Sequence, residues 1–88
     1  MIKLDDVMKA IEKYSWKNNS DYNRVVYMKF FTDASDFWIV LAEVTDADND
    51  RHWVVFEGVG TTVSEYYKFE YRSNKAYDCF LSEINECL

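Results

Sequence analysis

The chain has 88 residues and a net charge of −6, with 49% apolar residues, 18% aromatic residues and no proline. This length corresponds to a single compact domain, residues 1–88, and so high an apolar content excludes a disordered chain. No apolar run approaches the roughly 18 to 20 residues of a membrane-spanning helix, and the N-terminus lacks a signal-peptide pattern, so the sequence predicts a cytoplasmic protein.

The first predicted element is an amphipathic helix at about residues 3–16. Its apolar residues recur at the spacing that places them on one helical face, namely Leu4, Val7, Met8, Ile11 and Tyr14. The polar residues 17–21 that follow are typical of a loop. The chain is therefore expected to leave this helix through a short connection.

Four strands are predicted next. They are residues 22–31, residues 37–45, residues 52–57 and a last strand that includes residues 67–72. In the first strand, Val26, Met28 and Phe30 are expected to share one face. The second strand is apolar at every position up to Ala42, which indicates a central strand covered on both faces. Residues 61–66 fit either a strand or a helical turn.

The chain is predicted to close with a second helix, which Ser73 or Asn74 can cap. Glu83 and Glu86 near its end oppose the helix dipole. The connections are short, including a tight one at residues 58–60, and short connections favour antiparallel neighbours. The predicted fold is therefore α+β: a four-stranded antiparallel meander flanked by an N-terminal and a C-terminal helix, in the order α-β-β-β-β-α.

The acidic residues are concentrated in the middle of the chain. Residues 31–67 hold eight acids against one base, Arg51, whereas residues 1–30 hold more bases than acids. Carboxylates held in turns and at strand ends could occupy a basic groove made for a phosphate backbone. Alternatively, these carboxylates bind no partner and only keep the protein soluble. The predicted partner-binding residues are Asp33, Asp36, Glu43, Asp46, Asp48, Asp50, Glu57 and Glu65.

Residues 46–57 carry carboxylates at the first, third, fifth and last positions, as in a calcium-binding EF-hand loop. Arg51 stands where such a loop needs glycine, and the second half of the segment is predicted as a strand, so an acidic hairpin turn is favoured. The single histidine, His52, has no recognisable nucleophile pattern around it. We therefore expect no enzymatic activity, no metal and no cofactor.

In its small size, acidity, lack of a catalytic motif and predicted α+β build, the chain resembles small phage-encoded anti-defence proteins, such as anti-CRISPR inhibitors and DNA mimics. The resemblance implies a non-catalytic inhibitor that binds the basic nucleic-acid-binding surface of a CRISPR effector or other defence nuclease, in the host-cell cytoplasm. Direct contact with nucleic acid or a membrane is not expected of an acidic surface. The alternative is an immunity-type, antitoxin-type or homodimeric module that uses an aromatic sheet face.

Overall fold

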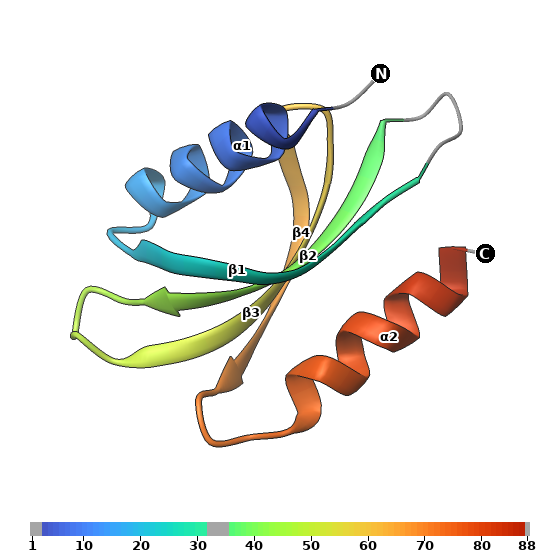
Figure 1. The fold of residues 1–88 in the computed structure, drawn as a ribbon. Helices are drawn as coiled ribbons and strands as arrows, with labels where there is room; N and C mark the ends of the chain where they lie inside the picture. The colour runs from blue at the N-terminus through green and yellow to red at the C-terminus, as the bar shows by residue number, and fades with distance from the viewer. Residues whose placement is uncertain (1–2, 32–35, 88) are drawn as a thin grey trace.

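The computed structural model describes residues 3–31 and 36–87 (Figure 1). Within them, the strands form one antiparallel sheet in the order β1-β2-β3-β4. The elements are α1 (Leu4–Lys17), β1 (Asp21–Phe30), β2 (Phe37–Thr45), β3 (Arg51–Val59), β4 (Thr62–Glu70) and α2 (Lys75–Cys87). The predicted α+β fold and its element order are confirmed. Neither helix in these residues is long and apolar enough to cross a membrane.

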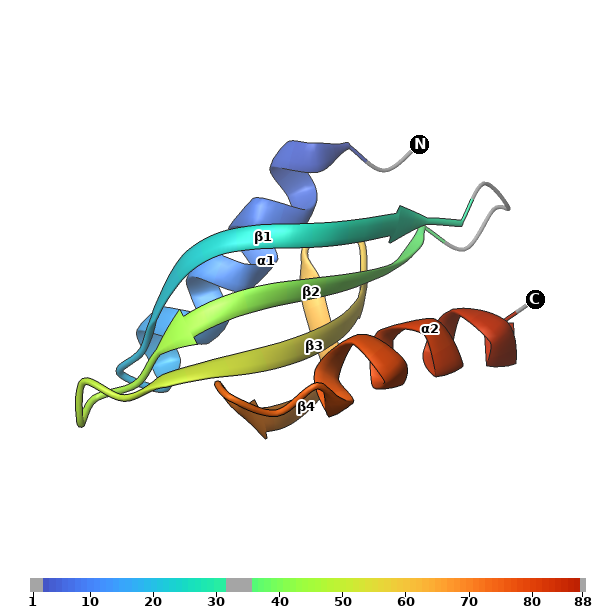
Figure 2. The ribbon, with the colours of Figure 1, turned by 60° about the horizontal axis from the view of Figure 1, so that its bottom comes forward.

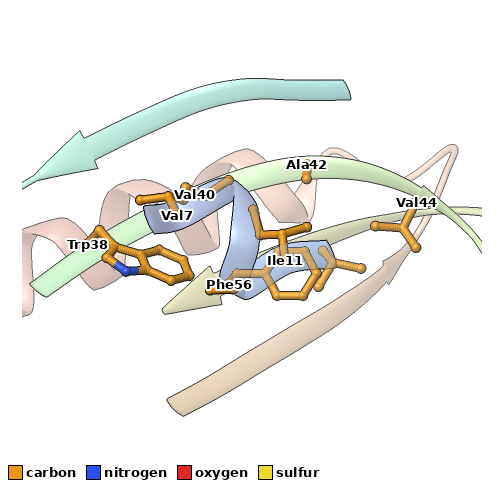
Figure 3. Close-up of a cluster of buried hydrophobic side chains, with 9 residues drawn as sticks. Val7, Ile11, Trp38, Val40, Ala42, Val44 and Phe56 are labelled. Carbon is orange, nitrogen blue, oxygen red and sulfur yellow. The ribbon is translucent and has the colours of Figure 1, made fainter. Parts of the chain in front are cut away.

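The two helices pack on opposite faces of the sheet (Figures 1 and 2). On one face, Val7 and Ile11 of α1 are fully buried against side chains of β2 and β3, as Figure 3 shows. On the other face, Ala76 and Phe80 of α2 pack on the alternate residues of the same strands. Strand β2 is buried from Trp38 to Val44, which confirms the prediction of a central strand covered on both sides.

Residues 61–66, left open by the sequence, lie mostly in β4, which pairs with β3 from Thr62 onward. The predicted tight connection at residues 58–60 is shorter than expected, because Gly58 and Val59 are still part of β3 and Gly60 begins the turn. Gly60 has a positive φ of 57°, which glycine adopts without strain.

The expectation that Val26, Met28 and Phe30 share one face of β1 is wrong for Val26. The pairing of β1 with β2 is irregular between Val25 and Tyr27, so the alternation of side chains shifts there. Val25 packs toward α1 together with Met28 and Phe30, whereas Val26 is exposed and borders a groove on the α2 side. Residues 25–28 are all apolar, so their pattern does not indicate where the bulge lies.

Candidate functional site

The predicted site residues do not form one row along the sheet. Strand β2 has nine residues, so its two ends lie roughly 30 Å apart. Asp36 directly precedes β2, whereas Asp46, Asp48 and Asp50 lie in the turn after it, at the opposite end of the sheet in Figure 2. Asp33 lies outside the described residues. The acidic residues therefore belong to separate groups.

Asp46 fixes the turn between β2 and β3. Its Oδ1 accepts hydrogen bonds from the backbone N–H groups of Asp48 and Asp50, both at 3.0 Å. Its Oδ2 lies 2.8 Å from Nε2 of His52 and 3.7 Å from Nζ of Lys68. The hydrogen bonds from Asp50 and His52 hold the pKa of Asp46 below its ordinary value, although some desolvation opposes them. Asp46 is thus a charge-paired structural residue, while Asp48 and Asp50 are exposed.

Replacing Asp46 with Ala is expected to lower the melting temperature by several degrees, because two backbone donors and His52 lose their acceptor at once. Thermal unfolding followed by circular dichroism measures this change. Asp48→Ala is the matched control in the same turn, and it should melt close to the unaltered protein. Equal melting temperatures for the two variants would contradict the structural role of Asp46.

Glu43 is also neutralised by a neighbour. It lies on the α2 side of β2, is 6% exposed, and its Oε2 lies 3.3 Å from Nε of Arg24 on β1. The guanidinium of Arg24 also lies over the ring of Trp53, 5.8 Å from its centroid. A buried carboxylate with a cationic partner has little charge left to offer an external surface. Glu43 therefore supports the sheet.

Glu57 lies buried on the same face, without a cationic partner in the part of the chain that the structure describes. It is 7% exposed, and its Oε2 has no hydrogen-bond partner. Its cross-strand neighbour on β4 is Glu65, whose Oε2 accepts a hydrogen bond from the Tyr67 hydroxyl at 2.8 Å. Burial, together with the negative charges of Glu83 and Glu65, raises the pKa of Glu57 to about 7.

Two carboxylates of α2 complete this group. A hydrogen bond with Glu83 raises the pKa of Glu86. Burial, together with the negative charges of nearby glutamates, raises the pKa of Cys79 to about 11. Among residues 3–31 and 36–87, no lysine or arginine forms an ion pair with any member of the group. We name this group the α2 acidic cluster: Glu57, Glu65, Glu83 and Glu86.

Glu83 and Glu86 were not among the residues predicted for the site. Their signal in the sequence was their position near the C-terminal end of a helix, where carboxylates interact unfavourably with the helix dipole. No basic residue in the last turn of α2 offsets them. What the sequence could not show is that α2 packs against β3, which brings Glu83 close to Glu57.

A groove between β1 and α2 is the second candidate surface. It encloses a cavity of about 380 Å³, and its lining includes Val26, Leu41 and Trp53. The rings of Tyr27 and Tyr77, 5.2 Å apart, also line it, and both residues are almost half exposed. Tyr27 and Tyr77 are exposed beside this groove on the α2 side, whereas Tyr66 is exposed on the α1 side, so the exposed aromatic side chains do not share one sheet face.

The pattern of a calcium-binding loop at residues 46–57 does not fold as one. His52 and Glu57 are both part of the extended strand β3, so they lie roughly 17 Å apart along it. Glu57 also faces α2, whereas His52 contacts Asp46 on the other side of the sheet. Glu57 therefore cannot close a coordination shell begun by Asp46.

Comparison with protein-family models, with curated proteins and with solved structures finds no match to this chain. The α2 acidic cluster and the apolar groove beside β1 are its two candidate binding surfaces.

Proposed function

We propose that this chain is a non-catalytic binding protein whose α2 acidic cluster docks on the basic, nucleic-acid-binding surface of another protein. The observation that carries the proposal is a set of four carboxylates, one of them buried, with no lysine or arginine paired to them among the described residues. Burial and the negative charges of Glu83 and Glu65 raise the pKa of Glu57, and a hydrogen bond with Glu83 together with its negative charge raises the pKa of Glu86. A cationic partner would relieve the repulsion between these charges.

The electrostatics favour a protein partner with clustered arginine or lysine side chains. Such clusters are typical of surfaces that bind a phosphate backbone, and an acidic protein can compete for them with the nucleic acid. Glu65 and Glu86 are exposed and would meet the partner first. Glu57 lies beneath and adds negative charge as it ionises. A CRISPR effector or another defence nuclease in the host-cell cytoplasm is the partner class that fits this chemistry and the resemblance noted above.

The proposal is tested by reversing charges on the cluster and, as a control, on the opposite side of the molecule. Glu65→Lys with Glu86→Lys changes the cluster, and Glu12→Lys with Asp21→Lys changes exposed residues on α1 and at the beginning of β1. Both double variants change the net charge by the same amount. Displacement of fluorescent DNA from a panel of purified effector nucleases measures binding.

At least one effector is expected to release DNA when the unaltered protein is added. The cluster variant should weaken this competition at least about tenfold, because charge reversal replaces attraction by repulsion at each contact. The control variant should weaken it no more than about threefold, and added salt should weaken competition by the unaltered protein. Equal losses in the two variants, or no released DNA with any effector, would contradict the proposal.

A second candidate function is supported by the exposed aromatic groove. Tyr27 and Tyr77 present apolar surface between β1 and α2, and a partner protein or a second copy of the chain could bury it. An immunity-type, antitoxin-type or homodimeric module would use such a surface. Binding that survives the cluster variant and is lost in Tyr77→Ser would favour this second function.

A further inference from the structure

One group of side chains with metal-ligating atoms lies away from the α2 acidic cluster, at the opposite end of the sheet. Asp46, Asp50 and His52 each place one ligating atom within 4.8 Å of the other two. Nε2 of His52 lies 2.8 Å from Oδ2 of Asp46. The turn brings together an imidazole nitrogen and two carboxylates from seven consecutive residues.

We propose that Asp46, Asp50 and His52 bind a divalent transition-metal ion of the Zn²⁺ type. Zinc is bound by histidine nitrogen and carboxylate oxygen at about 2.0 to 2.2 Å, which places neighbouring ligand atoms roughly 3.3 Å apart in a tetrahedron. The 2.8 Å between His52 and Asp46, and the upper limit of 4.8 Å on all separations in the group, are compatible with this value. Asp50 is exposed, so its side chain is free to rotate toward the other two ligands. This inference is independent of the proposed function.

The chemistry of the ligands selects the metal. An imidazole nitrogen suits zinc and its neighbours among the transition metals, whereas calcium prefers a shell of six to eight oxygen atoms. The turn supplies too few oxygen ligands for calcium once Glu57 is excluded by its place on the far face. The site therefore revises two expectations from the sequence, the absence of a metal and the calcium alternative.

Glu70 is the candidate for a fourth ligand. Glu70 on β4 is the cross-strand partner of His52, and directly opposed residues of an antiparallel pair have Cβ atoms about 4.5 to 5.5 Å apart on the same face. His52 also borders two cavities, of about 450 Å³ and about 190 Å³, with room for the ion and water ligands. The larger cavity is lined by Asp50, His52 and Glu70 together with Arg51, Tyr71 and Arg72.

Lys68 is the cation that now lies closest to Asp46, with Nζ 3.7 Å from Oδ2. Its side chain is half exposed, so it can turn into solvent when a metal ion takes its place. The Asp46 carboxylate keeps its two backbone hydrogen bonds through Oδ1 while Oδ2 binds the ion. Metal binding is therefore compatible with the turn as it is folded.

Isothermal titration of the full chain with ZnCl₂ tests the site, and Asp50→Asn and Asp48→Asn form a matched pair. Both variants remove one carboxylate from the same exposed turn, but only Asp50 is a proposed ligand. Asp50→Asn is expected to weaken Zn²⁺ binding at least about tenfold, and Asp48→Asn less than about threefold. His52→Gln should abolish the binding, since it removes the only imidazole in the chain.

A second readout locates the ion. His52 is the only histidine, so its ring gives a single set of NMR signals, and one equivalent of ZnCl₂ should shift this set. An equal concentration of CaCl₂ should leave it in place. The proposal is overturned if the ring signals do not respond to Zn²⁺, if Asp48→Asn weakens binding as much as Asp50→Asn, or if His52→Gln binds Zn²⁺ unchanged.

Discussion

Replacing Glu57 with Gln is expected to raise the free energy of unfolding at pH 8 by up to about 3 kcal/mol and to leave it nearly unchanged near pH 4. The reason is the burial of this carboxylate beside Glu83 and Glu65, which raises its pKa to about 7. Chemical denaturation of the variant and the unaltered protein at several pH values measures the difference.

The direction in which the free energy of unfolding changes with pH follows from the raised pKa of Glu57. Because the pKa of Glu57 in the folded chain lies above the ordinary value of 4.5, folding favours the protonated form. The stabilisation that depends on this proton is complete below about pH 4.5 and is lost as the pH rises through about 7. Glutamine stays neutral throughout, so the advantage of the variant should grow over the same range.

Glu43→Gln is the control, since Glu43 is a second buried glutamate on the same face of the sheet. Its carboxylate pairs with Arg24, so the substitution removes an attraction where Glu57→Gln removes a repulsion. The control is expected to lower the free energy of unfolding by about 1 kcal/mol or less. If Glu57→Gln did not raise the free energy of unfolding more at pH 8 than at pH 4, ionisation of Glu57 would not destabilise the fold.

Most of the fold could be predicted because the periodicity of the sequence is strong. The predicted bounds of β2, residues 37–45, match the structure, since a continuous apolar run between two polar turns leaves little freedom of register. Residues 61–66 lack such a run, and only the pairing of residues 62–66 with β3 makes them a strand. The irregularity near Val26 was missed for a related reason, because a bulge depends on the neighbouring strand as well as on local sequence.

The acidic surface was predicted less well, because the charge of a residue says nothing about its partners. Glu43 and Arg24 are 19 residues apart in the sequence, and only the pairing of β1 with β2 brings them together. Asp46 was predicted as part of a free acidic turn, but its carboxylate is engaged by the turn and by His52. Glu83 joined the surface through the packing of α2 against the sheet, which composition cannot reveal.

The two glycines should respond very differently to replacement by alanine. A Cβ atom at Gly58 would lie 2.5 Å from the carbonyl oxygen of Thr62 and would overlap the indole ring of Trp38. Trp38 is fully buried, and its Nε1 donates a hydrogen bond to the Gly60 carbonyl at 2.9 Å, so the ring has nowhere to move. Gly58→Ala is therefore expected to lower the free energy of unfolding by about 3 kcal/mol.

Gly60→Ala is the matched control for this prediction. Nothing lies within 4 Å of a Cβ at that position, so the substitution adds only the strain of a positive φ, about 1 kcal/mol. Denaturant unfolding followed by tryptophan fluorescence compares the two. The pairing of β3 with β4 is irregular at the step from Glu57 to Gly58, where the Ser64 hydroxyl donates to the Glu57 carbonyl at 3.1 Å. A clash at Gly58 would therefore also shift Glu57 relative to Glu65. If Gly58→Ala and Gly60→Ala had equal free energies of unfolding, the close packing of Gly58 against Trp38 and Thr62 would be contradicted.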